Sequence, residues 1–435
     1  MQNPSDPVNT YPQLFLGLRS LQTGLNAIIQ ANLLIGNTMF STFELSRLPR
    51  VIFGRGTLTQ VAKLSSGFGR RALIVTGAKT LDRCASWPDL CAAFAHEQVS
   101  WEQVHIPGEP SPDLIDSLVE SHARETIDVV IGIGGGSALD AAKAIAGLLR
   151  PGNSVRDHLE GVGPELPYLG PTTPFIAVPT TAGTGSEATK NAVLSEGGEG
   201  GFKKSFRDDR LIAEWAVIDP DLLATCPPAI IAANGMDAFT QLLESFVSTR
   251  ANPLCDTLAL DGLTRVRGSL LPWFNDPHSP DAAPYRADMA YAALLSGITL
   301  AQVGLGSVHG LAAPLGAFFP ISHGVACGTL VAEATRFNIE ALRARLPDSP
   351  ALKKYATVGR LLTLGPDMDD LDAQAALVST LERWTQTMAL PRLSAFGIDE
   401  KAIPKLVTNC RGSSMKTNPI GLTDAEVASL LRARI

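Results

Sequence analysis

The sequence predicts an α/β domain built on a parallel sheet, followed by an all-α domain. The chain has 435 residues, more than a single hydrophobic core usually supports, so two domains are expected. Short apolar runs alternate with helical stretches between residues 43 and 226. From residue 227 to 435, apolar residues recur every three to four positions and β-branched runs are few, which is typical of packed helices.

Four apolar runs in the first part have the character of buried strands. Helical sequence such as ALDAAKAIAGLL follows the third run directly. Strands that alternate with helices predict a parallel sheet with crossover helices. The four runs are RALIVTG (71–77), SWEQVHIPG (100–108), DVVIGIGGGS (128–137) and PFIAVPTTAGTGSE (174–187). The later segment KKSFRDDR (203–210) is expected to be a charged, solvated loop, with contact to an anionic substrate as the alternative.

The proline-containing stretch DPDLLATCPP (219–228) marks the change from one pattern to the other. The predicted domains are therefore a dinucleotide-binding α/β domain over 43–226 and a helical metal-binding domain over 227–435. Residues 1–42 are expected to be an N-terminal extension. Their apolar stretch is interrupted by polar residues, which disfavours a signal peptide or a membrane span. They form either an extra helix or leader sequence upstream of a true start at Met39, and we prefer the second.

The composition indicates which kinds of binding partner the protein is not expected to have. The net charge is −7 and no lysine and arginine residues cluster in a stripe, so nucleic acid is not an expected partner, and neither is a membrane. The six cysteines are scattered and include no CxxC pair. This spacing indicates buried thiols in a reducing compartment, and a cytoplasmic protein is expected.

A glycine-rich turn, GIGGGS, joins the third run to its helix. Gly134, Gly135, Gly136 and Ser137 lie in or beside it. Glycines allow close backbone approach, and the helix N-terminus favours an anion, so the turn suits a pyrophosphate. The spacing is neither GxGxxG nor the P-loop pattern. A tight turn that only lets the helix pack on the sheet therefore remains the alternative.

Two further positions are expected to face the same crevice. In VPTTAGTGSE, the hydroxyls of Thr180 and Thr181 follow a neighbouring strand. Gly77 ends the first strand where many dinucleotide sites carry an acidic residue for the ribose 2′-hydroxyl. Because the segment TGAK has no acid, and Lys79 stands nearby, NADP or the use of both dinucleotides is favoured over NAD alone.

Two histidines stand in a strongly apolar segment, GSVHGLAAPLGAFFPISHGVA. They are His309 and His323, and Asp237 lies on a preceding predicted helix with Gln241 one turn after it. A single such histidine would more often be a core residue. The pair with Asp237 makes a metal site an equally good interpretation.

These motifs, taken in order, resemble the iron-containing, group III alcohol dehydrogenase family from about residue 43 to 435. The motifs are GGGSALDAAKAI, VPTTAGTGSE, VIDP, NGMDAFT, GLGSVHGLAAPLGAFFPISHGVA and NPIGLTDAE. The resemblance implies a Rossmann-like α/β domain plus an all-α domain, the two-domain fold of dehydroquinate synthase. It implies nucleotide contacts at Gly77, Ser111, Gly134, Gly135, Gly136, Ser137, Thr180, Thr181 and Lys203. It implies metal ligands at Asp237, His309 and His323.

The chain departs from the family at two of these motifs. Gln241 stands where the family usually has a third histidine ligand, and Ala313 where many members have a histidine assigned to proton relay. Gln241 is interpreted as a weaker oxygen ligand, with a substrate contact or a metal-free descendant as alternatives. No general acid is assigned.

The implied function is a metal-dependent, NAD(P)-linked alcohol dehydrogenase or aldehyde reductase. Fe²⁺ is the family's metal, with Zn²⁺ or another divalent ion as alternatives. A metal-independent, maleylacetate-reductase-like enzyme is the nearest competing hypothesis. A dehydroquinate-synthase-like cyclase and an inactive nucleotide-binding protein are the others. The partner is expected to be a small alcohol or aldehyde, and the resemblance suggests a homodimer or larger homo-oligomer.

Overall fold

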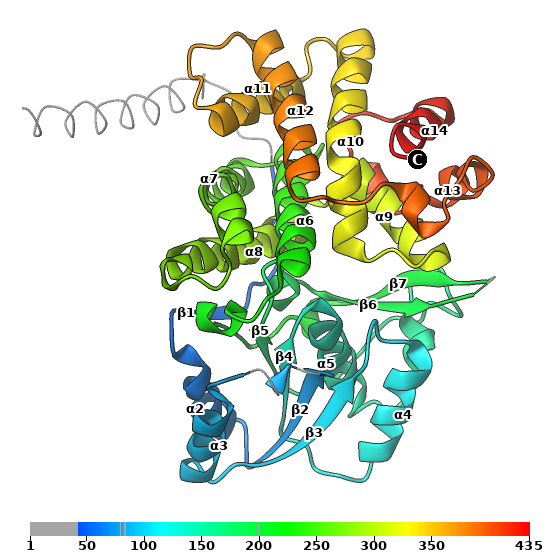
Figure 1. Cartoon of the computed structure of the whole chain (residues 1–435). Helices are drawn as coiled ribbons and strands as arrows, with labels where there is room; N and C mark the ends of the chain where they lie inside the picture. The colour runs from blue at the N-terminus through cyan, green and yellow to red at the C-terminus, as the bar shows by residue number, and fades with distance from the viewer. Residues whose placement is uncertain (1–41, 79, 82–83, 199) are drawn as a thin grey trace, which may run out of the picture. The chain divides into compact units, whose positions relative to one another are not determined.

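A six-stranded parallel sheet forms the first part of the computed structural model (Figure 1). The structure describes residues 42–78, 80–81, 84–198 and 200–435, so Lys79 and residues 1–41 of the expected extension lie outside the described residues. The strand order is β1-β8-β5-β4-β2-β3. The strands are β1 (Arg50–Phe53), β2 (Arg71–Gly77), β3 (Ser100–Ile106), β4 (Val129–Gly134), β5 (Phe175–Pro179) and β8 (Trp215–Ile218).

All neighbouring strands in this sheet are parallel, so their carboxyl ends share one edge. Gly77 at the end of β2 pairs with Ile106 of β3, and Gly134 at the end of β4 pairs with Pro179 of β5. Strands β3 and β4 lie on opposite sides of β2, so the direction of the chain across the sheet reverses between β2 and β4. A reversal of this kind leaves a ligand crevice at the carboxyl edge.

Helices cover both faces because the strands are apolar on both sides. On β2, Ala72 and Ile74 pack with residues of α2 and α3, whereas Leu73 and Val75 pack with residues of α4 and α5. This alternation follows from the two-residue period of a strand. The helices are α2 (Gln60–Ser66), α3 (Trp87–His96), α4 (Pro112–His122) and α5 (Gly136–Leu148).

A separate antiparallel hairpin corrects the expectation of a loop over residues 203–210. Strands β6 (Asn191–Glu196) and β7 (Phe202–Arg207) pair along their whole length. The charges of the segment suggested a loop, but Phe206 is fully buried, with its ring 5.1 Å from that of Tyr168. This aromatic anchor attaches β7 to the α/β domain. Strand β7 also packs on a helix of the second part, α9.

The second part of the chain is helical, and α6 lies in contact with α7, α8 and α10 (Figure 1). Its helices are α6 (Pro228–Val247), α7 (Pro253–Asn275), α8 (Ala283–Val303), α9 (Ser307–Phe318), α10 (His323–Arg345), α11 (Pro350–Thr363), α12 (Asp370–Thr387), α13 (Ile403–Asn409) and α14 (Asp424–Arg432). The expectation of an α/β part followed by an all-α part is confirmed. We retain the boundary between residues 226 and 227 as a proposal.

The core of the helical part extends into the turn that follows β5. Ala182 and Ala188 of this turn are buried in the same hydrophobic cluster as α6 and α8. Gly185 has φ of 60°, and a Cβ built on it would lie only 2.4 Å from the backbone of Gly297 on α8. Because only glycines allow two backbones to approach so closely, this turn holds the sheet edge against the helices.

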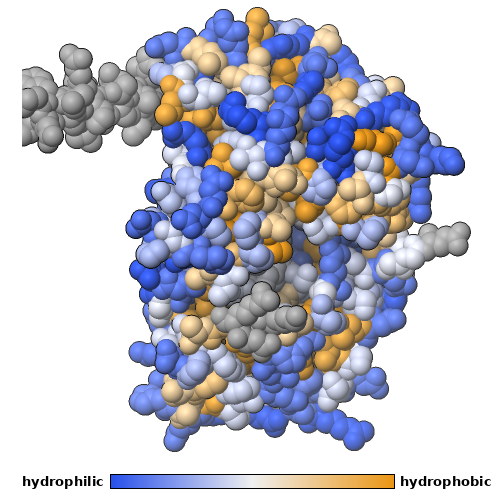
Figure 2. All heavy atoms as spheres, in the orientation of Figure 1, coloured by the Kyte–Doolittle hydropathy of each residue, from blue (hydrophilic) through white to orange (hydrophobic). Residues whose placement is uncertain are grey.

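The visible surface is mostly polar, with small apolar groups interspersed (Figure 2). Within the described residues, no single helix has both the length and the hydropathy needed to cross a membrane. One bent pair, Pro280–Val303 with Ser307–Phe318 at 100°, meets both requirements together. All six cysteines lie in the described part of the chain and are free thiols.

Candidate active site

The carboxyl edge of the sheet brings together most of the positions predicted to contact a nucleotide. Gly77 and Gly134 end adjacent strands, and a Cβ built on Gly134 would lie 3.4 Å from the nitrogen of Gly77. Thr180 follows β5, and its N–H donates to the Gly134 carbonyl at 2.9 Å. The strand ends therefore lie in contact at the point where the sheet order reverses.

The turn before α5 has the backbone geometry of an anion site. Gly135 is the N-cap of α5 and makes no side-chain capping bond, so the first N–H groups of the helix are available to a ligand. A Cβ on Gly136 would lie 2.7 Å from Thr184 Cγ2, and one on Gly135 would lie 3.3 Å from Thr181 Oγ1. The glycines are thus needed where the two turns meet. Ser137, in the first turn of α5, is partly exposed.

Ser111 and Lys203 lie on other elements than the glycine-rich turn: the N-terminus of α4 and the strand β7. Ser111 caps α4, with its Oγ accepting from the Leu114 N–H at 3.2 Å. Lys203 lies on β7 and forms an ion pair with Glu109, whose other oxygen accepts from the Ser195 hydroxyl at 2.6 Å. Burial opposes ionisation of Glu109, but Lys203 holds the pKa of that carboxyl below its usual value. Lys203 thus places a nearly buried positive charge on the hairpin, paired with Glu109.

Four potential metal ligands converge from three helices. Asp237 comes from the middle of α6, His309 from the first turn of α9, and His323 and Cys327 from the first turns of α10. Asp237 Oδ1 lies 3.3 Å from His309 Nε2 and 3.6 Å from His323 Nε2. The Cys327 Sγ lies 3.6 Å from His309 Nε2 and 3.8 Å from His323 Nε2. All four donor atoms lie within 4.8 Å of one another.

Glu244 holds His309 in its orientation. Its carboxylate accepts from His309 Nδ1 at 2.7 Å and from the backbone N–H groups of Gly306 and Val308 at 2.9 and 2.7 Å. These three donors compensate the burial of the carboxylate, which also lies at the N-terminus of α9. A Cβ on Gly306 would lie 2.9 Å from Glu244 Oε1, so glycine is required for this approach. The bond to Nδ1 directs Nε2 toward Asp237, as metal-binding histidines require.

The electrostatics of the cluster follow from burial among opposite charges. Burial alone would raise the pKa of Asp237, but His323 and His309 hold it below its usual value. Burial would lower the pKa of His309, yet Cys327, Asp237 and Glu244 raise it well above its usual value. Burial, with Lys203 and His309 adding to it, lowers the pKa of His323 to about 4. His323 is therefore neutral at neutral pH, the form that can donate a lone pair.

The donors present fit a divalent cation. Asp237 Oδ2 and His323 Nδ1 are buried and have no hydrogen-bond partner among the described residues. An unpaired carboxylate oxygen in an apolar interior is costly unless a cation or water satisfies it. One carboxylate and two imidazoles, with a thiol beside them, are the ligand types that Zn²⁺ and other first-row divalent ions take.

The two departures from the family pattern lie near this cluster. Gln241 is buried one turn after Asp237 on α6, and its Oε1 accepts from the Ser296 hydroxyl at 2.7 Å. Ala313 lies on α9, one turn after His309. The structure thus brings Asp237, His309 and His323 together, while the ligand role of Gln241 stays a prediction.

Sequence reasoning missed Cys327 and Glu244. Cys327 was grouped with the structural thiols because no CxxC was present, although its spacing of four from His323 puts both on one helix face. Glu244 follows Asp237 and Gln241 at the seventh position, which also continues one face of α6. In both cases the helical period was the signal that could have found them.

Comparison with known proteins agrees with the geometry. Residues 49–220 match the iron-containing alcohol dehydrogenase family, and residues 231–435 match the C-terminal part of the Fe-containing alcohol dehydrogenase family. Alcohol dehydrogenase 4 of Schizosaccharomyces pombe is 32% identical over 388 residues, which is 88% of this chain and 86% of that protein.

Two solved structures share the fold. One is an archaeal halo-thermophilic alcohol dehydrogenase from a Red Sea brine pool, with a TM-score of 0.83 and 26% identity over 92% of this chain and 100% of that one. The other is the sulfoacetaldehyde reductase of Bifidobacterium kashiwanohense in complex with NAD⁺, with a TM-score of 0.77 and 26% identity over 91% of this chain and 99% of that one. With family matches over both parts of the chain, this protein belongs to the iron-containing alcohol dehydrogenase family.

Proposed function

We propose that this protein transfers hydride reversibly between a small alcohol or aldehyde and NAD(P), in the crevice where the sheet edge meets helices α6, α9 and α10. Family membership makes it an NAD(P)-linked alcohol dehydrogenase that uses a divalent metal. The metal-independent, maleylacetate-reductase-like alternative is not favoured.

One observation carries the proposal: a single turn contacts both the predicted nucleotide site and α6, the helix that carries Asp237. Thr181 and Thr184 of this turn meet the glycines before α5, as described above. A Cβ atom built on Gly183 would lie 2.8 Å from Asn234 of α6. A Cβ atom built on Gly185 would lie 2.4 Å from Gly297 of α8. This packing fixes the position of the two sites relative to each other. Such positioning of the reactants accounts for much of the rate acceleration of a hydride transfer.

The residues that would hold the cation are Asp237, His309 and His323, with Gln241 as the fourth position predicted from the family pattern. When bound, a divalent ion there polarises the oxygen of an alcohol or carbonyl as a Lewis acid. Glu244 fixes the imidazole of His309, and His323 is neutral and can donate a lone pair. Apolar residues of α6, α9 and α10 around the donors exclude bulk water.

The nucleotide-contacting set is proposed to be Gly77, Ser111, Gly134, Gly135, Gly136, Ser137, Thr180, Thr181 and Lys203. The glycine turn and the N-terminus of α5 support a pyrophosphate, and glycine at position 77 supports NADP in preference to NAD. Ser111 and Lys203 have the weakest support, because one caps α4 and the other pairs with Glu109. We also propose a cytoplasmic homo-oligomer.

The test is turnover of a panel of short aldehydes with NADPH and with NADH, before and after removal of metal by a chelator. We expect NADPH oxidation by the native protein, loss of most activity after chelation, and recovery when Fe²⁺ or Zn²⁺ is added back. Product mass separates reduction from cyclisation. Undiminished turnover in rigorously metal-free protein would end the metal-dependent proposal and revive the maleylacetate-reductase-like alternative.

A further inference from the structure

We propose that Cys327 is the fourth protein ligand of the metal site, completing a set of one carboxylate, two imidazoles and one thiolate. This inference rests on the metal-dependent function proposed above, and it gives Gln241 a supporting place outside the coordination set. It concerns a residue type that the family pattern does not place there.

Four of the six separations between the donor atoms are close to those of a tetrahedral site, and the other two are at most 4.8 Å. For bonds of roughly 2.1 Å to nitrogen and oxygen and roughly 2.3 Å to sulfur, neighbouring tetrahedral donors lie about 3.4 to 3.6 Å apart. The observed separations from Cys327 Sγ to the two histidine Nε2 atoms are 3.6 and 3.8 Å. Those from Asp237 Oδ1 to the same nitrogens are 3.3 and 3.6 Å. The side chains are therefore arranged around one point before any ion is considered.

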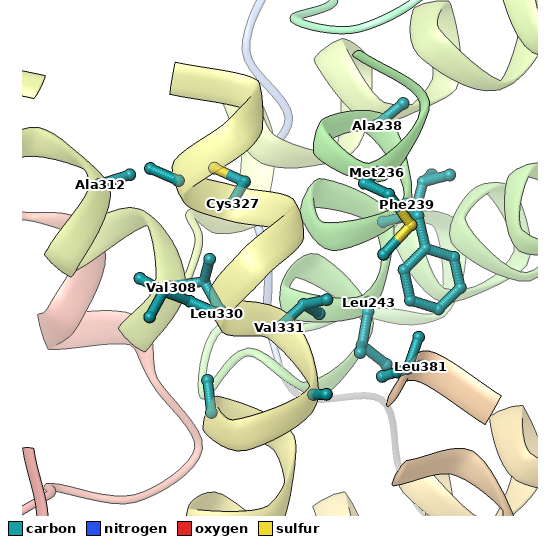
Figure 3. Close-up of a cluster of buried hydrophobic side chains, with 14 of the residues drawn as sticks. Met236, Ala238, Phe239, Leu243, Val308, Ala312, Cys327, Leu330, Val331 and Leu381 are labelled. Carbon is teal, nitrogen blue, oxygen red and sulfur yellow. The ribbon is translucent and has the colours of Figure 1, made fainter. Parts of the chain in front are cut away.

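The surroundings of Cys327 set it apart from an ordinary core thiol. Figure 3 shows it on α10 between α9, which carries Val308 and Ala312, and α6, which carries Met236 and Phe239. In this apolar setting the sulfur nonetheless lies against both imidazoles. Asp237 Oδ2, on a side chain that is 1% exposed, has no hydrogen-bond partner in the described part of the chain. That unpaired oxygen is an independent sign of a missing cation.

The side-chain oxygen of Gln241 already accepts a hydrogen bond from another residue. This oxygen, Oε1, accepts a hydrogen bond from the hydroxyl of Ser296 on α8 at 2.7 Å, which occupies one of the two lone pairs that it could offer a metal. A Cys327 thiolate also neutralises more of the charge of a divalent ion than the uncharged amide of Gln241 would. Asp237 and a thiolate together neutralise a divalent ion, which lowers the cost of burying it.

On binding, the sulfur–hydrogen bond of Cys327 breaks, its proton leaves to solvent, and the sulfur electron pair forms the bond to the ion. No oxidant or reductant takes part. A thiolate ligand shifts the preference of the site toward softer borderline ions such as Zn²⁺ and Co²⁺ and away from oxygen-preferring ions.

The direct test is the absorption spectrum of the full-length protein reconstituted with Co²⁺. A thiolate bound to Co²⁺ gives an intense charge-transfer band in the near ultraviolet, which oxygen and nitrogen donors do not give. We expect this band in the native protein at one equivalent of Co²⁺. Its absence, with Co²⁺ demonstrably bound, would overturn the proposal without the need for any variant.

Variants show which residue produces the Co²⁺ charge-transfer band and which residues contribute to Zn²⁺ affinity. In Cys327→Ser the band should disappear, and Zn²⁺ affinity, measured by competition with a chromophoric chelator, should fall about 100-fold or more, since loss of even an outer partner costs 10- to 100-fold. Cys255→Ser is the matched control, because Cys255 is also buried but lies on α7 beside Asp256. It should keep both the band and the affinity.

Gln241→Ala distinguishes the two candidate ligands and should weaken Zn²⁺ binding by less than tenfold. A larger loss from Gln241→Ala than from Cys327→Ser would overturn the proposal. Turnover measured on the same samples keeps the two proposals separable. A cobalt band without alcohol oxidation would refute the function alone, whereas metal-dependent oxidation without the band would refute the cysteine ligand alone.

Discussion

The regions proposed to bind the nucleotide and the metal are built in different ways. The region predicted to bind the nucleotide relies on backbone: its glycines and threonines end or directly follow β2, β4 and β5, so each predicted contact lies within a few residues of a strand end. The metal cluster is made of side chains: a carboxylate, two imidazoles and a thiol that come from α6, α9 and α10. A backbone site tolerates changes of side chain but not the loss of glycine. A side-chain site depends on a few atoms and on the residues that orient them.

The largest effect is expected at the side-chain site. Asp237→Asn keeps the shape of the residue but removes the charge at the centre of the cluster, so kcat/KM for aldehyde reduction should fall by about 1000-fold or more. Elemental analysis should show that the bound metal is lost while NADPH binding is kept. Asp256→Asn, which removes a carboxylate paired with Lys354 at 2.8 Å, is the control. An active, metal-bearing Asp237→Asn protein would contradict the claim that the metal site depends on a few side-chain atoms.

The second prediction concerns the turn that joins the two regions. Burial raises the pKa of Glu187 to about 7 from its usual 4.5, so the folded protein holds a proton that the unfolded chain has lost in this window. The stability from this group is complete below pH 4.5 and declines as pH rises to about 7, by up to about 3 kcal/mol. Glu187→Gln should flatten that decline.

Urea denaturation at a series of pH values measures this effect. Relative to the native protein, Glu187→Gln should gain stability steadily between pH 4.5 and 7. Glu340→Gln, at an exposed position on α10, should follow the native curve. Parallel curves for native protein and Glu187→Gln would show that Glu187 is ionised in the folded state.

The third prediction tests the residue that orients the side-chain site. Glu244→Gln keeps the size of the side chain but weakens its acceptance of three N–H donors, including His309 Nδ1. Metal affinity should fall 10- to 100-fold, the usual cost of losing an outer partner. Chelator competition measures it, with Glu333→Gln on α10 as the control. Unchanged affinity would mean that His309 is oriented by packing alone.

The smallest effect is expected at the backbone site. A Cβ on Gly134 would lie 2.5 Å from the Cβ of Ala138, so Gly134→Ala must displace the turn before α5. The Kd for NADPH should rise about tenfold, while metal affinity stays unchanged. Fluorescence titration of NADPH gives the Kd. Gly421→Ala is the control, since its Cβ would meet no described atom within 4 Å. Equal losses of nucleotide and metal binding would show that the two regions are not independent.

The same difference explains what the sequence could predict. The strand runs, their terminal glycines and the helical second part were visible because each is a local pattern. The residue pattern made a metal site at Asp237, His309 and His323 only an equally good interpretation, and the family resemblance assigned them as ligands, since no local rule brings α6, α9 and α10 together. Cys327 and Glu244 were missed because their roles depend on those crossings. The hairpin was missed because the burial of Phe206 outweighs the charges of its strand.

The most direct test of the account is a titration of metal-free protein with Zn²⁺ or Fe²⁺ while NADPH oxidation by a short aldehyde is followed. We predict that the rate rises in proportion to added metal and levels off at one equivalent per chain. The same titration of Asp237→Asn should stay flat. A full rate before any metal is added, or no saturation near one equivalent, would contradict the claim that this cluster holds the ion required for hydride transfer.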